Sequence, residues 1–238
     1  MLEVEGLYYK YDDGTQALCG VDLKIDRGET IALVGPNGSG KSTLLMCLSG
    51  LYFGQGTVRI DGMEMTKSGM KEIRGRVGLV FQSPDDQLFM PTLADDLAFG
   101  PINLGYDRAK VQERIDDAAS QMQLSDMLDR APYHLSMGQK RNASIATVLA
   151  MQPSLLMMDE PSSNLDPRSR RRLIEVLESL DTTMLIASHD LALIGRLCKR
   201  TALIDEGQIV ADGPTADILG NRTLMEEHGL EVWPETAG

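Results

Sequence analysis

The stretch GPNGSGKST, residues 35–43, comes directly after the apolar run IALV, and its three glycines are followed by one lysine and two hydroxyl residues. Glycines let successive backbone N–H groups point into one hollow, and the start of a helix adds partial positive charge. In the pattern G-x-x-x-x-G-K-[ST], Lys41 can reach the outer phosphates of a nucleotide and the Ser42 hydroxyl can bind Mg²⁺. An ordinary glycine turn is the alternative, and the position between an apolar strand and a helix argues against it. The predicted phosphate-binding residues are Gly35, Asn37, Gly38, Ser39, Gly40, Lys41, Ser42 and Thr43.

Two adjacent carboxylates end another apolar run, LLMMDEP. Asp159 suits a water-mediated Mg²⁺ contact, and Glu160 could polarise an attacking water. Paired acids after a strand are also common as helix caps or solvated turns. The glycine loop elsewhere in the chain favours the catalytic interpretation.

Composition limits the remaining classes of protein. The chain has 238 residues and a net charge of -12, so its overall field repels nucleic acid and we expect no nucleic-acid partner. The apolar runs are too short for a membrane span, and the acidic start MLEVEG is unlike a signal peptide. Cys19, Cys47 and Cys198 are scattered, which argues against a disulfide framework or zinc site and favours a reducing cytoplasm.

Strand and helix patterns alternate around these motifs, which indicates an α/β fold with a mostly parallel sheet. The first third reads as strands and turns up to residue 35, followed by a helix from Lys41. Residues 85–150 are mostly helical, with Thr92 and Asp107 as predicted helix caps. Apolar strands return at 154–160 and 182–188, and the pair 201–207 and 208–213 predicts a hairpin.

The segment LSMGQKRNASIATVLAM, residues 135–151, resembles the signature segment of ABC-type ATPases. SSNLD resembles the D-loop of that family, ASHD its switch histidine, and LVFQSPDDQLF its Q-loop, all in the family's order. The resemblance implies a P-loop NTPase with an N-terminal antiparallel β subdomain and an inserted helical subdomain. We expect one domain: an ATPase core at 1–84 and 152–213, the helical signature subdomain at 85–151, and a C-terminal extension at 214–238.

The family resemblance also implies a head-to-tail dimer that holds ATP between the phosphate loop of one chain and the signature segment of the other. Ser136, Gly138 and Gln139 would then face the γ-phosphate bound by a second copy. Asp166 is predicted to cap the helix that begins at Pro167, and the resemblance adds a D-loop contact across the dimer. The charged run RSRRR after it is expected to be a solvated helix face.

Further roles follow from the same resemblance. Tyr11 is placed to stack on adenine, with Tyr8 and Tyr9 as alternatives. Gln82 would contact Mg²⁺ and the attacking water, and His189 would contact the γ-phosphate. The candidates for catalysis are Glu160, His189, Gln82 and Lys41, and those for Mg²⁺ are Ser42, Gln82 and Asp159.

One position departs from the family pattern. Met137 stands where the signature usually has glycine, and a left-handed backbone there would cost about 1 kcal/mol or more. Ser136, Gly138 and Gln139 are retained, so we expect the phosphate contact to survive.

Sequence stretches outside the short motifs indicate which kind of ABC-type ATPase the chain resembles. Three stretches are similar to the ATPases of energy-coupling-factor importers: YKYDDGTQALCGVDLKI, PDDQLF beside the Q-loop, and the C-terminal tail. The tail is most similar to the cobalt/nickel branch. This implies an ATP-hydrolysing subunit at the cytoplasmic face of the membrane, powering uptake of a trace metal or a vitamin. Its partners would be a transmembrane scaffold, a substrate-binding membrane subunit, and a second ATPase, either identical or related.

Two other functions remain open from the sequence. A soluble ABC-type ATPase acting on DNA or ribosomes would normally need a second ATPase unit or a long coiled-coil insert. A module that binds ATP without hydrolysing it is also conceivable, and the presence of Glu160 and His189 argues against it.

Overall fold

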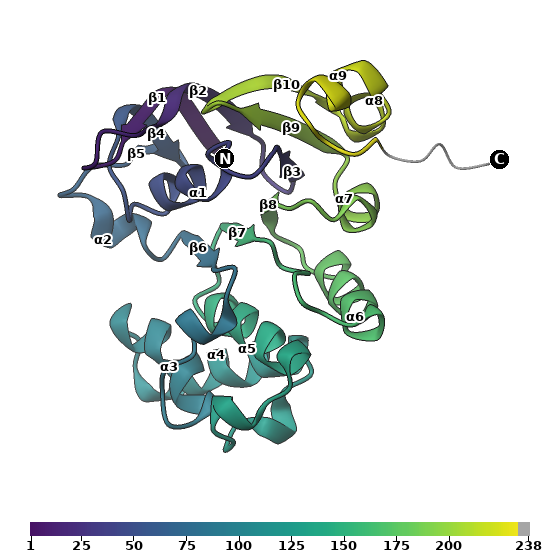
Figure 1. Ribbon diagram of the computed structural model, residues 1–238. Coiled ribbons are helices and arrows are strands. Elements are labelled where there is room, and N and C mark those ends of the chain that lie inside the picture. Colours follow the sequence, from purple (N-terminus) through teal and green to yellow (C-terminus); the bar gives the residue numbers. More distant parts are fainter. Residues whose placement is uncertain (233–238) are drawn as a thin grey trace.

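The computed structural model describes residues 1–232, so residues 233–238 of the predicted C-terminal extension lie outside the described residues. An antiparallel sheet of order β2-β1-β4-β5 forms one edge of the molecule (Figure 1). In the outer β1–β2 pair, Leu2 lies opposite Ile25 and Val4 opposite Leu23, and these side chains are all buried. The strands are β1 (Leu2–Lys10), β2 (Gln16–Ile25), β4 (Gln55–Ile60) and β5 (Met63–Glu64).

A second sheet of order β10-β9-β3-β8-β7-β6 forms the centre. Its neighbouring strands pair in parallel except at the β9–β10 hairpin, as the sequence predicts. Every residue of β7 and β8 is buried, because helices and loops cover both faces of a parallel sheet. The strands are β3 (Thr30–Val34), β6 (Val77–Val80), β7 (Leu155–Asp159), β8 (Thr183–Ala187), β9 (Arg200–Asp205) and β10 (Gln208–Pro214).

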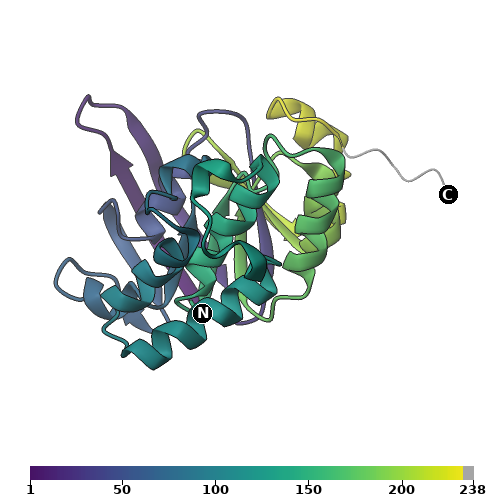
Figure 2. The same cartoon turned by 90° about the horizontal axis from the view of Figure 1, so that it is seen from below.

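The long helices of the middle third gather at the end opposite the β1–β2 pair (Figures 1 and 2). They are α3 (Leu93–Asn103), α4 (Arg108–Gln121) and α5 (Met137–Leu149), and we call them the helical insert. The other helices are α1 (Lys41–Leu48), α2 (Met70–Ile73), α6 (Pro167–Glu178), α7 (Leu191–Leu197), α8 (Thr215–Leu219) and α9 (Arg222–Glu227). No helix within residues 1–232 combines the length and apolar character needed to cross a bilayer.

Three helix starts confirm the predicted caps. The Thr92 side chain accepts a hydrogen bond from the Asp95 backbone N–H, and Asp107 accepts one from Lys110. Asp166 accepts from the N–H groups of Arg168 and Ser169, directly before Pro167 in the first turn of α6.

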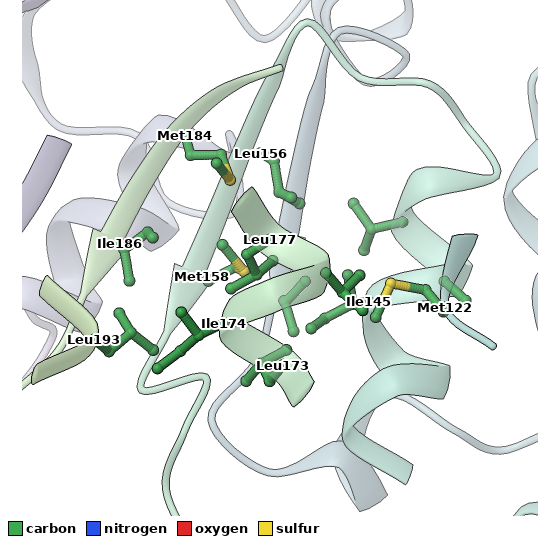
Figure 3. Close-up of a cluster of buried hydrophobic side chains, with 14 of the residues drawn as sticks. Met122, Ile145, Leu156, Met158, Leu173, Ile174, Leu177, Met184, Ile186 and Leu193 are labelled. Atoms are coloured by element: carbon green, nitrogen blue, oxygen red, sulfur yellow. The ribbon is translucent and has the colours of Figure 1, made fainter. Parts of the chain in front are cut away.

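Two apolar clusters cover the opposite faces of the central sheet. Side chains of a strand alternate between faces, so Leu156 and Met158 join one cluster while Leu155 and Met157 join the other. Figure 3 shows the first cluster, in which Leu173, Ile174 and Leu177 of α6 lie with Met158 and Ile145. This packing fixes the ends of β7 and β8, where the candidate catalytic residues begin.

Candidate nucleotide-binding and hydrolysis site

A cavity of about 460 Å³ opens at the carboxyl ends of β3 and β7, above the first turn of α1. Residues from five separate stretches of the chain meet there, as expected of a ligand site at the carboxyl end of a parallel sheet. Its lining comprises Tyr11, Thr15, Gln16, Ala17, Asn37, Gly38, Gly40, Lys41, Ser42, Thr43, Gln82, Asp159, Glu160 and His189.

The phosphate loop depends on glycine where the backbone turns left-handed. Gly38 has φ 80° and Gly40 has φ 108°, conformations that side-chain-bearing residues rarely adopt. A Cβ on Gly40 would also lie 2.7 Å from the Ala17 carbonyl oxygen. Gly40 is the N-cap of α1 and supplies no side-chain hydrogen bond, so the first N–H groups of the helix remain available to an anion.

Lys41 reaches back along this loop. Its Nζ donates to the carbonyl oxygens of Gly35 at 2.7 Å and Pro36 at 2.9 Å. Burial lowers the pKa of Lys41, while the nearby carboxylates of Glu160 and Asp159 act in the opposite direction. The ammonium group is therefore held over the loop, where a bound phosphate would compete with two neutral carbonyls for it.

Gly35 and Ser39 shape the loop from outside the cavity. A Cβ on Gly35 would lie 2.0 Å from the Ile204 carbonyl oxygen, so only glycine fits against β9. Ser39 is buried, and its carbonyl accepts a hydrogen bond from Gly207 at 3.0 Å. The two positions act on the backbone of the loop and do not line the cavity.

Oxygen donors suited to Mg²⁺ meet at one side of the cavity. Burial raises the pKa of the Asp159 carboxyl at the end of β7, and the neighbouring Ser42 hydroxyl acts in the opposite direction. Carboxylate, hydroxyl and amide oxygens are the ligands that Mg²⁺ prefers, and Gln82 supplies the amide at the rim. The three residues predicted from the sequence thus fit this ion.

Glu160 follows Asp159 with a left-handed backbone at φ 47°. Its Oε2 lies 2.8 Å from His189 Nδ1 and accepts hydrogen bonds from the Ser188 hydroxyl at 3.2 Å and the His189 N–H at 3.4 Å. These contacts, at the end of β8, fix the carboxylate, while the His189 side chain remains 76% exposed. Strained backbone of this kind is concentrated at functional sites, where the surroundings over-determine it.

Tyr11 lies beside the phosphate loop, with its hydroxyl 2.8 Å from Thr43 Oγ1. Its ring packs edge-on against Tyr9 at 5.1 Å and against Tyr52 at 6.0 Å, so it is held from two sides. Tyr8 and Tyr9 line a neighbouring cavity instead. Of the three tyrosines weighed for adenine, Tyr11 alone lines the cavity of the phosphate loop.

The signature segment lies on the helical insert and does not line the cavity. Ser136 and Gln139 form a capping box: the Ser136 N–H donates to Gln139 Oε1 at 2.9 Å, and the Gln139 N–H to Ser136 Oγ at 3.3 Å. A Cβ on Gly138 would lie 2.8 Å from Ser169 Oγ, and Asp166 accepts a hydrogen bond from the same hydroxyl. Within this chain, Gly138 of the signature segment therefore lies close to the start of α6.

Met137 is the first residue of α5 and is not among the described residues with positive φ. The backbone strain considered for it from the sequence is absent. Its side chain is 41% exposed at the surface of the insert.

Two residues that sequence reasoning did not single out hold the Q-loop. Arg141 donates to the carbonyl oxygens of Phe81 at 2.9 Å and Gln82 at 2.6 Å, and Gln87 accepts from the Phe81 N–H at 3.2 Å. Burial lowers the pKa of Arg141 to about 10. No signal in the sequence marked Arg141, because a KR pair on a helix normally indicates solvated surface.

One member of the RSRRR run also has a specific contact, the ion pair of Arg170 with Asp190.

Known proteins are similar to this chain in sequence and in fold. The sequence model of the ABC transporter family matches residues 18–163. The chain belongs to the ABC transporter family. A Streptomyces coelicolor protein, provisionally named an ABC transporter ATP-binding protein, is 51% identical to this ABC ATPase over 232 residues, which span 97% of this chain and 89% of that protein.

Two further comparisons concern named transport systems. The energy-coupling factor transporter ATP-binding protein EcfA of Methanothermobacter thermautotrophicus is 41% identical over 243 residues, covering 100% of this ABC ATPase and 78% of EcfA. Among solved structures, cbiO1 from Clostridium perfringens, part of the ABC transporter complex cbiONQ, matches with a TM-score of 0.83 and 33% identity, over 95% of this chain and 93% of that one. The predicted resemblance to energy-coupling-factor ATPases and the predicted P-loop fold are confirmed, and the ABC ATPase binds and hydrolyses ATP.

Proposed function

We propose that this ABC ATPase is the energy-supplying subunit of an energy-coupling-factor importer, peripheral to the cytoplasmic face of the membrane. An apolar groove beside the Q-loop carries the proposal. The groove has a volume of about 580 Å³ and lies where the helical insert meets the core. Its walls include Phe81, Phe89 and Phe99, so a helix of a membrane subunit could bury its apolar face there.

Exposure of the groove residues supports docking of a partner. Phe89 is 62% exposed and Phe99 is 44% exposed, with their ring centroids 5.1 Å apart. At the floor, Asp96 is 3% exposed, and its Oδ1 accepts from the N–H groups of Phe89 and Met90. Its Oδ2 has no hydrogen-bond partner among residues 1–232, and burial raises the pKa of this carboxyl. A donor from a docked helix would satisfy that oxygen.

The proposed chemistry uses the cavity residues in distinct roles. Tyr11 stacks on adenine, while Lys41 and the loop amides bind the phosphates. Mg²⁺, held by Ser42, Asp159 and Gln82, supplies charge neutralisation at the outer phosphates when bound. Glu160 accepts a proton from the attacking water. The 2.8 Å contact between Glu160 and His189 keeps the carboxylate and the imidazole on the same side of the cavity.

We further propose that the active form is a head-to-tail dimer in which Ser136, Gly138 and Gln139 of one copy complete the other copy's site. Subunit mixing tests this directly. Lys41→Ala disables the loop and Ser136→Arg blocks the signature, so each variant alone should be inactive. A one-to-one mixture should recover about a quarter of wild-type turnover, since half of randomly paired dimers carry one intact site. A mixture as inactive as its parts would contradict the dimer.

The membrane partner is tested by affinity purification of the tagged chain from detergent-solubilised membranes of its own host. We expect a polytopic scaffold protein to co-purify with the wild type and to be lost with Phe89→Asp. Leu51→Asp is the matched control, because Leu51 is 56% exposed and does not line the groove. Co-purification of nucleic acid or ribosomes in place of a membrane protein would favour the soluble alternative.

For the cargo, we propose a trace metal such as cobalt or nickel, with a vitamin as the alternative. The support is the similarity of the C-terminal tail to the cobalt/nickel branch and the match to cbiO1. ATP-dependent uptake of Co²⁺, Ni²⁺ and vitamins into vesicles carrying the purified complex distinguishes them.

A further inference from the structure

Arg141 carries a buried charge in the helical insert. Arg141 is 1% exposed, and its guanidinium forms no ion pair with a carboxylate among residues 1–232. Its Nε has no hydrogen-bond partner there either. Burying a charge without a paired opposite charge costs several kcal/mol, so a purely structural position would be better filled by an apolar residue.

The two groups that receive this charge are adjacent peptide carbonyls. Arg141 Nη1 lies 2.9 Å from Phe81 O, and Nη2 lies 2.6 Å from Gln82 O. These carbonyls come directly after β6, where Gln82 enters the lining of the nucleotide cavity. Both hydrogen bonds are made by one planar guanidinium, which restricts rotation of the peptide between them.

A second set of contacts joins the same segment to the same helix. Gln87 accepts from the Phe81 N–H and donates through Nε2 to Ser144 O at 2.6 Å and to Thr147 Oγ1 at 2.8 Å. An exposed ion pair of 2.6 Å also joins Asp85 to Lys140. Residues 81–87 are thus attached to α5 along two turns of the helix.

The helix that receives these contacts begins with the signature segment, since Ser136 is its N-cap. We propose that Arg141 is a positioning residue for ATP hydrolysis, which fixes Gln82 in the nucleotide cavity relative to the signature helix. Movement of α5, whether from the groove or from a second copy, then changes the position of Gln82 directly. The inference rests on the proposed function in one respect, the role of Gln82 at Mg²⁺ and water.

The test is a double-mutant cycle on the purified full chain, with kcat, KM, ATP affinity and melting temperature measured for each variant. Arg141→Lys keeps the charge and loses the two-pronged contact. A misplacement of about 1 Å can cost on the order of 100-fold in rate, so we expect kcat to fall about 10-fold with ATP affinity unchanged. In a Gln82→Ala background the same change should lower kcat by less than about 2-fold, because the two residues act as one unit.

Two further variants keep the result interpretable. Gln87→Leu removes the parallel contact without exposing a buried charge, and it should lower kcat several-fold only when Gln82 is present. Asn142→Ala is the matched control on the same helix, because its amide donates to Met122 O and does not touch the Q-loop. It should leave kcat unchanged.

An equal loss in both backgrounds, or no loss with Arg141→Lys and Gln87→Leu, would overturn the positioning role. If Gln82→Ala itself leaves kcat unchanged, the role of Gln82 fails and the inference fails with it. The membrane-partner proposal is judged separately, by co-purification.

Discussion

The starts of α1 and α5 are both assigned to phosphate, yet they are built in opposite ways. α1 begins at Gly40, which is left-handed and supplies no side-chain cap. α5 begins at Ser136, which forms a capping box with Gln139. In that box each side chain accepts a hydrogen bond from the backbone N–H of the other residue. Phosphate binding at α1 therefore displaces no side-chain cap, whereas a phosphate at α5 must compete with the cap for the Gln139 N–H.

The difference extends to the surroundings of the two helices. The start of α1 shares its cavity with Asp159, Glu160 and His189, while the start of α5 contacts Ser169 at the beginning of α6. The first site is thus organised to bind nucleotide and carry the chemistry within one chain. The second is a stable surface which, in the proposed dimer, completes the reaction when it is presented to a second copy.

The largest effect is expected from a substitution in the cavity at the start of α1 that removes the proposed catalytic base. Glu160→Gln keeps the shape of the side chain and its hydrogen-bond capacity but cannot accept the proton of water. We expect kcat to fall on the order of 1,000-fold, with ATP binding and the ATP-bound dimer retained. Turnover assays and light scattering with ATP check this, and unaltered turnover would show that another residue is the base.

A smaller effect is expected from adding a side chain at Gly40, the N-cap of α1. Gly40→Ala places a methyl group against the Ala17 carbonyl oxygen in a left-handed backbone, so the loop must shift. ATP binding measured by calorimetry should weaken on the order of 100-fold. Gly62→Ala is the control, since Gly62 has φ +76° with nothing within 4 Å of an added Cβ, and it should leave ATP affinity intact. Equal losses in both variants would mean that ATP affinity falls through general destabilisation of the fold and not through the close contact at Gly40.

On the signature side, Ser136→Ala removes the cap of α5. Loss of an N-cap costs about 1 kcal/mol of stability, and loss of the contact across the dimer should lower kcat about 10-fold with ATP affinity unchanged. Thr92→Ala removes a similar cap from α3 and should cost stability without changing kcat. If Ser136→Ala loses ATP affinity instead, the serine belongs to the same copy's site and the contrast between the two helices fails.

The smallest effect is expected from replacing Met137, which departs from the family pattern, by glycine. Met137 is helical, so Met137→Gly should lower the free energy of unfolding by about 0.5–1 kcal/mol through backbone entropy, without relieving strain. Urea denaturation measures the change, and turnover should remain near wild type. A several-fold rise in kcat would show that the methionine side chain obstructs approach of the second copy.

Local sequence predicted the fold and most residues that line the candidate cavity because its signals are short-range. The glycine loop, the alternation of apolar strands with helices, and the caps at Thr92, Asp107 and Asp166 each depend on a few neighbouring residues. Six motifs in one order sufficed to place a resemblance that the family match confirms.

The sequence alone therefore predicted a phosphate loop and determined which family the chain belongs to, since spacing along the chain encodes backbone conformation at a helix start. Tertiary structure alone decided that Arg141 is buried against Phe81 and Gln82, that Gly35 must pass beside Ile204, and that Glu160 pairs with His189. These contacts join residues between 29 and 169 positions apart, and no local pattern specifies which distant backbone atoms a side chain will meet after the sheet has formed. Their geometry arises from packing of the helical insert and the hairpin on the central sheet, which is a property of the whole chain.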